Sequence, residues 1–320
     1  MTPAKSAPAA GVYTAVIGAV NMDLWGRSRA PLRQRDSNPG AVYISPGGVG
    51  RNIAHNLRLL GEAVEMLTVL GGDLWADALA ASCAALGIGL ERAKRVPEGR
   101  TGAYLYITGP EGDMALAVCD TDLARSITPA LVEQNLDWLN RAALVVFDGN
   151  LAEETVAFLT AHCTSPLFAD PVSAAKAGHL AQALGRIHTL KPNALEAEVL
   201  CGERDPARAA AALHRMGVRH VFVSAGSQGV YAAGPEGCVH VPCIPGPVVN
   251  TTGAGDAALA ALCKSFLAGR TTEEAARYAM AAASLTVGSP ETIAPALSDA
   301  AVRARLAASI HTTEERKSYI

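Results

Sequence analysis

Short apolar runs of strand length alternate along the chain with segments that have the spacing of amphipathic helices. The first run, residues 14–20 (TAVIGAV), predicts a strand buried on both faces. A helix should follow, because Ile53, Leu57 and Leu60 recur at helical spacing and Gly61 marks an end. Repeated alternation of this kind is typical of an α/β fold, whose mostly parallel central sheet is covered by helices on both faces.

The alternation continues along the rest of the chain. Further strands are predicted at residues 63–72, 143–150, 166–172, 188–193 and 220–226. Further helices are predicted at residues 73–87, 153–163, 179–187, 194–202, 206–216, 254–269 and 271–289. Asp73 is the expected N-cap of the first of these helices and Gly87 its end, and Thr272 is the expected cap of the last.

Two segments interrupt this rhythm. Residues 24–46 contain turn formers and a short strand pattern, and residues 101–121 alternate like a hairpin whose turn is GPEGD. We expect both to join in a small antiparallel sheet that projects from the main domain as a lid. The alternative is that they are two separate excursions on the surface.

Composition narrows the class of protein. The 320 residues are 50% hydrophobic and carry a formal net charge of −3 without a dense Lys/Arg stripe, which argues against a nucleic-acid partner. No run of about 18 apolar residues occurs, so no membrane partner is expected. The seven cysteines are scattered and form no C-x-x-C, which is typical of reduced thiols in a cytoplasmic protein. We expect one domain at residues 12–312 between tails at 1–11 and 313–320.

The segment NTTGAGDAAL, residues 250–259, places an acid in the first turn of a predicted helix. The free N–H groups and the dipole of a helix N-terminus favour anions, and the glycines let the backbone approach a ligand closely. Asp256 could then accept the proton of a hydroxyl that attacks a phosphoryl group. An acid at this position also stabilises a helix by about 0.3–1 kcal/mol with no catalytic role.

Two segments near the N-terminus carry groups suited to a sugar. Residues 45–57 form a glycine-rich turn that enters a helix near Asn52, whose amide both donates and accepts hydrogen bonds. Asn21 and Asp23 lie on the same side of an extended segment, where an amide and an acid suit a vicinal diol. Taken singly, each of these residues is also an ordinary turn or cap residue.

Together these segments resemble the PfkB (ribokinase-like) family of carbohydrate kinases, over nearly the whole chain. The matching motifs are N-x-D at 21–23, GG-x-x-x-N at 47–52, KPNALEAE at 191–198, SAGSQGVY at 224–231 and TTGAGDA at 251–257. One such motif arises easily by chance, but the whole set in this order does not. The resemblance implies a ribokinase-like fold with a lid and an ATP-dependent kinase that uses Mg²⁺.

The resemblance also implies roles for individual residues. The catalytic group comprises Asp256 as the base and the backbone amides of Gly253, Ala254 and Gly255 as an anion hole. The acceptor sugar is held by Asn21, Asp23, Gly48 and Asn52. Mg²⁺ is organised through waters by Asn193 and Glu196, and the nucleotide is lined by Ser224, Gly226 and Gly229.

One position departs from the family pattern. Asn250 stands where many members have an aspartate that helps to bind a monovalent cation. Asn250 and Thr252 still offer oxygen atoms, so K⁺ activation stays open.

A narrower resemblance concerns the acceptor. The segments RDSNPGAVYIS and DPVSAAK resemble those of family members that phosphorylate a nucleoside, and the lid is then expected to contact the base. Lids of this family also serve as dimer interfaces, so a homodimer is expected. Asp148 and Asn150 end a predicted strand, where α/β sheets collect ligands. The candidates for base contacts are Ser37, Asn38, Thr101 and Lys176.

Three alternatives remain at this point. The first is another kinase of the same fold, acting on ribose, inosine or adenosine. The second is a sugar- or nucleotide-binding protein without catalysis, which the intact GAGD segment argues against. The third is an NAD-dependent dehydrogenase, which lacks support because no early G-x-G-x-x-G motif follows the first strand.

Overall fold

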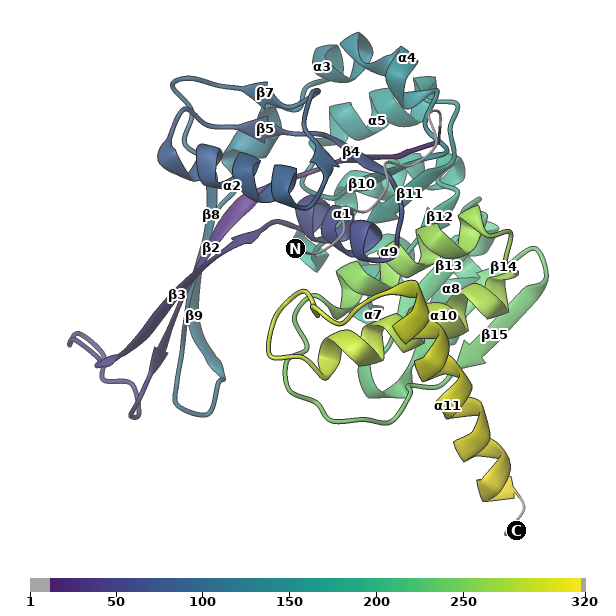
Figure 1. Ribbon diagram of the computed structural model, residues 1–320. Helices are drawn as coiled ribbons and strands as arrows, with labels where there is room; N and C mark the ends of the chain where they lie inside the picture. Colours follow the sequence, from purple (N-terminus) through teal and green to yellow (C-terminus); the bar gives the residue numbers. More distant parts are fainter. Residues whose placement is uncertain (1–11, 318–320) are drawn as a thin grey trace, which may run out of the picture.

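A computed structural model describes residues 12–317, with side chains described as far as residue 309. The predicted tail at residues 1–11 lies outside the described residues, as does the end of the tail predicted at 313–320. The last helix, α11 (Asp299–Lys317), continues past the predicted domain boundary at residue 312 and projects from the body (Figure 1).

The centre of the molecule is a nine-stranded sheet with the order β15-β14-β13-β12-β11-β10-β1-β4-β6. Its strands from β6 to β13 pair in parallel, which confirms the predicted mostly parallel sheet. The edge hairpin β14–β15 is antiparallel and was not predicted. The strands are β1 (Thr14–Ile17), β4 (Val64–Leu67), β6 (Ile88–Gly89), β10 (Leu144–Asp148), β11 (Leu167–Asp170), β12 (Thr189–Leu190), β13 (His220–Ser224), β14 (Val230–Gly234) and β15 (Gly237–Val241).

Helices cover both faces of this sheet (Figure 1). Alternate residues of one strand serve the two faces: Val145 and Phe147 of β10 pack on one side, and Leu144 and Val146 on the other. The first side carries α3 (Pro129–Gln134), α5 (Glu153–His162), α7 (Ala194–Cys201) and α8 (Pro206–Arg215). The second carries α1 (Val49–Leu59), α2 (Leu74–Ala85), α9 (Ala254–Leu267) and α10 (Thr272–Val287).

Two short helices, α4 (Leu136–Leu139) and α6 (Ala174–Ala177), and three 3₁₀ segments complete the helical part. The 3₁₀ segments are η1 (Asp122–Ser126), η2 (Gly178–Arg186) and η3 (Gly226–Gln228). No helix in residues 12–317 has the length and apolar character needed to cross a bilayer.

The predicted lid is a separate four-stranded sheet that extends away from the body (Figure 1). Its order is β3-β2-β8-β9, with β2 (Asn21–Ser28), β3 (Gly40–Gly47), β8 (Gly102–Thr108) and β9 (Met114–Asp120). The prediction of a purely antiparallel sheet was wrong, because β2 and β8 pair in parallel and the lid is therefore mixed. Both of these strands leave the body in the same direction, and each returns through its own antiparallel hairpin.

Two local predictions also need correction. The helix expected at residues 179–187 is the 3₁₀ run η2, preceded by one turn of α6. The cap of α10 is Thr271, not Thr272, because Thr271 is extended and its hydroxyl accepts the backbone N–H of Glu274. Thr272 is already helical, and its hydroxyl donates to Glu236 instead. Two further short strands, β5 (Val69–Leu70) and β7 (Lys94–Arg95), pair beside the main sheet.

Candidate active site

The predicted acid lies at the start of α9. Gly253 is the N-cap and has φ +82°, a left-handed conformation that glycine adopts without strain. A Cβ atom at this position would lie 2.0 Å from the carbonyl oxygen of Thr292, so the site has no room for a side chain. The turn therefore holds Asp256 in the first turn of the helix, beside backbone N–H groups that have no partner within the helix.

Asp256 is bound to a helix from the other end of the chain. The side-chain amide of Asn52, on α1, donates a 3.0 Å hydrogen bond to Oδ2 of Asp256. Burial, together with the neighbouring carboxylates of Asp170 and Asp148, raises the pKa of Asp256 to about 7, although Asn52 and Lys191 oppose the shift. A carboxyl group with a pKa near neutrality is suited to accept and release a proton.

A buried ion pair lies next to this acid. Nζ of Lys191 is 3.1 Å from Oδ2 of Asp170, and both side chains are only 7% exposed. Burial alone would lower the pKa of Lys191, but Asp170 and Glu196 raise it above its usual value, so the ammonium stays charged. Neither residue was predicted as a site residue, although Asp170 begins the segment DPVSAAK and Lys191 begins the motif KPNALEAE.

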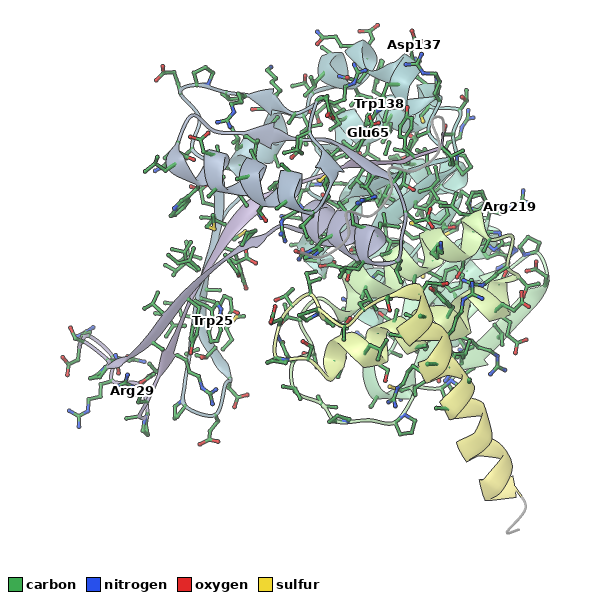
Figure 2. The ribbon with its side chains drawn as sticks, viewed as in Figure 1. Trp25, Arg29, Glu65, Asp137, Trp138 and Arg219 are labelled. Carbon is green, nitrogen blue, oxygen red and sulfur yellow. The ribbon has the colours of Figure 1, made fainter. Side chains whose placement is uncertain are left out.

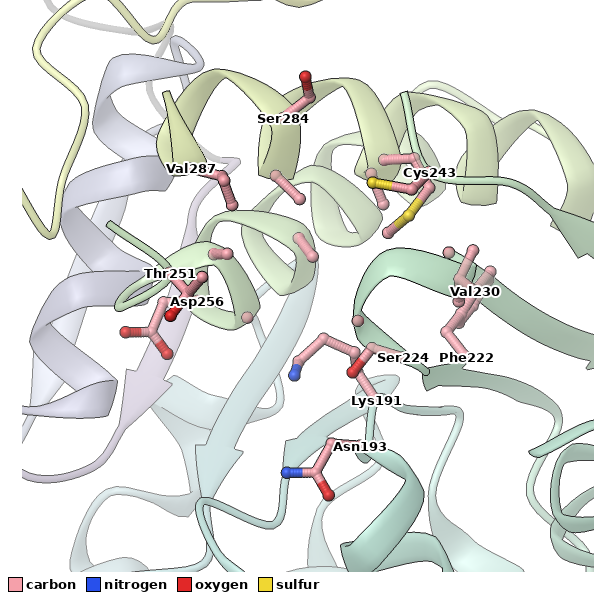
Figure 3. A pocket seen from close by; sticks show the side chains of 18 of the residues that line it. Lys191, Asn193, Phe222, Ser224, Val230, Cys243, Thr251, Asp256, Ser284 and Val287 are labelled. Atoms are coloured by element: carbon pink, nitrogen blue, oxygen red, sulfur yellow. The ribbon is translucent and has the colours of Figure 1, made fainter. Parts of the chain in front are cut away.

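Lys191 also approaches the start of α9. A Cβ atom built on Gly255 would lie 3.1 Å from Nζ of Lys191, so the glycine lets the helix turn lie against the ammonium. Figure 3 shows the Lys191 side chain directed toward the side of the pocket where Asp256 lies. An ammonium group and the N-terminus of a helix at one place form a positive site that favours a phosphoryl group.

A cavity of about 790 Å³ opens beside these groups and has the size of a ligand pocket. Its polar end contains Asp170, Lys191 and Asp256. The rest of its lining is largely apolar, with side chains from β13, β14 and α10 (Figure 3). The predicted nucleotide residues Ser224, Gly226 and Gly229 all line it, as do Asn193 and Glu196. The apolar lining includes Phe222, Val230, Ile244, Ala279, Met280, Ala283 and Val287.

Asn193 and Glu196 form a capping box at the start of α7. Oδ1 of Asn193 accepts the backbone N–H of Glu196 at 2.9 Å, and Oε2 of Glu196 accepts the backbone N–H of Asn193 at 2.8 Å. The amide of Asn193 also donates to Oε1 of Glu196 at 2.8 Å. Burial raises the pKa of Glu196. Local hydrogen bonds thus fix both side chains at the wall of the cavity.

The acceptor residues predicted from the N-terminal motifs lie where the lid joins the body. Asn21 and Asp23 are in the first half of β2, and Gly48 caps α1, which carries Asn52. Burial raises the pKa of Asp23 to about 6, which the charge of Arg51 opposes. Gly48 has φ +94°, and a Cβ there would lie 2.5 Å from the carbonyl oxygen of Ala19.

Asp148 lies at the carboxyl end of β10, as predicted, and is fully buried. Its carboxylate accepts the backbone N–H groups of Ala19 at 3.2 Å and Asn150 at 2.9 Å. Burial raises its pKa to about 6, although these hydrogen bonds oppose the shift. Asn150 accepts a hydrogen bond from Nζ of Lys176, so both of these predicted residues lie near the carboxyl end of the same strand.

The other proposed base contacts lie elsewhere. Ser37 and Asn38 are in the loop at the outer end of the lid, and Asn38 bonds to the backbone of Arg33. Thr101 is buried, and its hydroxyl donates to Oδ1 of Asp73 at 2.6 Å and accepts the N–H of Gly71. The side chains of Asn38 and Thr101 are thus engaged in hydrogen bonds within the protein, and the roles of all three residues stay predictions.

The two residues considered for a monovalent cation form a local turn. Oδ1 of Asn250 accepts the backbone N–H of Thr252 at 2.9 Å, and its amide donates to the carbonyl oxygen of Pro290 at 3.2 Å. Both residues are exposed or nearly so. The side chain of Asn250 is thus used to shape the turn before Gly253.

Comparisons with known proteins show the family of the chain. Residues 13–299 match the model of the pfkB family carbohydrate kinases. The pseudouridine kinase of Escherichia coli K12 is 37% identical over 299 residues, which are 91% of this chain and 95% of that protein. An uncharacterized sugar kinase of the same organism, YeiI, is 36% identical over 293 residues, or 89% of this chain and 81% of that protein.

The fold has a close counterpart among solved structures. The ribokinase of Thermotoga maritima superposes with a TM-score of 0.82 at 23% identity, covering 92% of this chain and 99% of that chain. This likeness concerns the fold, with its mostly parallel main sheet and separate small lid sheet.

Proposed function

Because the chain belongs to the pfkB family of carbohydrate kinases, we propose that it transfers the γ-phosphate of ATP to the 5′-hydroxyl of pseudouridine. Whichever acceptor it uses, the chain is an ATP-dependent kinase of sugars or nucleosides. The observation that carries the proposed chemistry is the position of Asp256, between the cavity and the acceptor residue Asn52.

In the proposed reaction Asp256 is the general base. Its carboxylate accepts the proton of the 5′-hydroxyl while the hydroxyl oxygen attacks the γ-phosphorus and the bond to ADP breaks. The hydrogen bond from Asn52 holds the carboxylate in one orientation, with its other oxygen free to meet the acceptor. Its pKa of about 7 leaves a substantial ionised fraction at neutral pH.

Charge on the transferred group would be stabilised at the opposite side of the same turn. The backbone N–H groups of Gly253, Ala254 and Gly255 begin α9, and Lys191 lies against Gly255. These donors are already in place before the reaction, so little reorganisation is needed as charge develops. Asp170 keeps Lys191 charged and fixes its position.

The donor set suits a hydrated Mg²⁺ that arrives with the nucleotide. Within residues 12–317 no group of three or more His, Cys, Asp and Glu side chains is arranged to hold a metal ion. Magnesium bound to a nucleotide uses only one or two carboxylates and keeps several waters. At the cavity wall Glu196 provides such a carboxylate, and the side chain of Asn193 lies beside it. When bound, the ion would neutralise charge on the phosphates. For a monovalent cation such as K⁺, the only ligands that we propose are the oxygens near Asn250 and Thr252.

The choice of pseudouridine rests on similarity, and the two bacterial relatives are nearly equal in identity. The deciding experiment measures phosphorylation of pseudouridine, uridine, inosine, adenosine and D-ribose with Mg-ATP and compares their kcat/KM values. Pseudouridine should have the highest value. A higher value for ribose or for another nucleoside would replace the proposed substrate and leave the kinase assignment in place.

A second class, a binding protein without catalysis, predicts a different result. Such a protein would bind ATP or a sugar with no turnover on any acceptor of the panel. The ordered Asn52–Asp256 contact and the glycine-shaped helix start argue against it, because binding alone does not require a carboxylate of raised pKa at this position.

We propose further that the lid joins two copies of the chain. Its aliphatic face consists of Leu24, Val42, Ile44, Leu105, Ile107, Leu116 and Val118. Most of these side chains are exposed, up to 76% for Val42, and a second copy would bury them. Leu116→Glu should convert a dimer to a monomer in light scattering, whereas Leu195→Glu, an exposed apolar site on α7, should not. A monomeric wild type would refute this.

For its location we propose the cytoplasm, where ATP is abundant and thiols stay reduced. All seven cysteines are unpaired in the described chain.

A further inference from the structure

The two faces of the lid differ in chemistry. Side chains alternate along a strand, so strand register decides which residues share a face. Trp25 of β2 is opposite Tyr43 of β3 and Tyr106 of β8, and Asp23 is opposite Tyr104. We call Trp25, Tyr43, Tyr104 and Tyr106 the aromatic face. The other face is the aliphatic one described above.

The rings of the aromatic face form a continuous row. Trp25 stacks on Tyr43 with ring centroids 4.1 Å apart and on Tyr106 at 5.9 Å, with interplanar angles of 18° and 5°. Tyr104 and Tyr106 follow at 5.5 Å. Tyr43 is 46% exposed and the other three rings are partly exposed. Figure 2 shows Trp25 on the side of the lid nearer to the body.

The aromatic face is the face that carries the acceptor residues. Asn21, Asp23 and Trp25 follow one another at intervals of two residues on β2, so their side chains point to the same side of the sheet. Burial raises the pKa of Tyr106, and the carboxylate of Asp23 raises it further, as expected for neighbours on one face. The step from Asp23 to Trp25 is about 6.6 Å along the strand. A sugar held at Asn21 and Asp23 would therefore place a substituent against the row of rings.

The positions nearest the body are kept free of side chains. Gly47 and Gly102 are opposite Asn21 in the two neighbouring strands. A Cβ at Gly47 would lie 2.1 Å from Oδ2 of Asp23, and one at Gly102 would lie 2.5 Å from Oδ1 of Asn21. The glycines thus leave the two polar side chains room at the base of the row, and bulky rings begin only farther out along the lid.

We propose that the row Tyr43–Trp25–Tyr106 is the subsite that contacts the base of the nucleoside acceptor, while Asn21 and Asp23 hold its sugar. The inference rests on the proposed function and assigns the residues that distinguish a nucleoside from a free sugar. Trp25 already stacks on Tyr43 and Tyr106, so a flat heteroaromatic base gains edge-to-face and apolar contact along the row, whereas D-ribose has no ring to place there. The alternative is that the rings only stabilise strand pairing, as cross-strand aromatic pairs do.

The kinetic test removes one ring and then replaces it. Trp25→Leu should lower kcat/KM for the preferred nucleoside, relative to that for D-ribose, by about 2- to 13-fold, mainly through KM. Trp25→Phe, which keeps a ring, should retain most of that ratio. The matched control is Trp75→Phe on α2, outside the lid, which should leave the ratio unchanged. A nucleoside-to-ribose ratio that Trp25→Leu leaves intact would overturn the proposal.

A binding test separates this proposal from the proposed reaction. Pseudouridine and uridine should quench the tryptophan fluorescence of the wild type and of Trp75→Phe, but not of Trp25→Phe, and D-ribose should quench none of them. Quenching at Trp25 without phosphorylation would support the subsite and refute the kinase reaction on nucleosides. Phosphorylation of pseudouridine without quenching at Trp25 would support the reaction and overturn the subsite. Absence of both would overturn the subsite as well.

Discussion

Asn52 on α1 donates a 3.0 Å hydrogen bond to Asp256 on α9, across 204 residues of sequence. The two helices start from different glycine-rich turns, and both turns are shaped by glycines with positive φ, at Gly48 and Gly253. The contact joins the motif proposed to hold the acceptor, in the N-terminal part, to the motif proposed for phosphoryl transfer, in the C-terminal part. It is therefore the point at which the two halves of the proposed chemistry meet.

Replacement of the base tests that contact directly. Asp256→Asn should lower kcat by about 10²- to 10⁴-fold, because the amide cannot accept the hydroxyl proton. Binding of a non-hydrolysable ATP analogue should change by less than about threefold, since the amide fills the same space. The control is Asp77→Asn, which removes an exposed acid from the first turn of α2. A variant with undiminished kcat would rule out Asp256 as the base.

The pH dependence follows from the state of the same carboxyl group. Asp256 has to be ionised to accept a proton, and its pKa is about 7, so kcat/KM should rise with pH up to about that value. The hydrogen bond from Asn52 lowers this pKa. Asn52→Leu should therefore move the acid limb of the kcat/KM profile to higher pH. An acid limb near pH 4 in the wild type would contradict the raised pKa of Asp256, because 3.8 is the ordinary value of an aspartate.

The raised pKa also has a consequence for stability. A carboxyl whose pKa is higher in the folded state binds its proton more tightly there, so its contribution to stability is full below pH 3.8 and is lost as the pH rises through about 7. Asp256→Asn removes this loss. The difference in unfolding free energy between the variant and the wild type should therefore grow, in favour of the variant, by about 1–2 kcal/mol from pH 5 to pH 8, allowing for partial exposure of the group. Urea unfolding at both pH values measures it, and a gain that is equal at both would contradict it.

The helices and strands around this site were largely predictable because their signals are local. Apolar periodicity located α1 and β10, and turn chemistry located Asp73 as the N-cap of α2. The hairpin β14–β15 was missed because it lies beyond the last recognised parallel strand, where alternation of strand and helix no longer guides the prediction. Thr271 was missed as a cap although Thr271-x-x-Glu274 matches the capping-box pattern, because the neighbouring Thr272 offered the same chemistry.

The candidate site was predictable only where a motif carries the residue. Asp256, Asn193 and Glu196 stand in such motifs, and their roles stay predictions. Asp170 ends strand β11 and Lys191 directly follows β12, and these strands are adjacent only after the sheet has formed, so the sequence alone does not reveal their ion pair. The hydroxyl of Thr101 is likewise bound to Asp73 through a contact that spans 28 residues.

The Lys191–Asp170 pair should behave as a buried pair. Lys191→Met should cost about 3–5 kcal/mol of unfolding free energy, because it leaves the charge of Asp170 buried without a partner. The double variant Lys191→Met with Asp170→Asn should recover most of that stability but little activity. As a control, Arg277→Met breaks an exposed pair and should cost under about 1 kcal/mol. Costs that simply add in the double variant would contradict the pairing.

The chain supplies its own control for the proposed magnesium residues, because it contains two capping boxes. Asn193 with Glu196 starts α7 at the cavity wall, and Thr271 with Glu274 starts α10 on the exposed surface. Asn193→Ala and Thr271→Ala should each cost about 0.5–2 kcal/mol of unfolding free energy, since each removes a cap. Only Asn193→Ala should also raise the Mg²⁺ concentration that gives half-maximal activity, because only its box lines the cavity proposed for the nucleotide. Equal Mg²⁺ dependence in the two variants, with equal loss of stability, would reduce Asn193 to a helix cap.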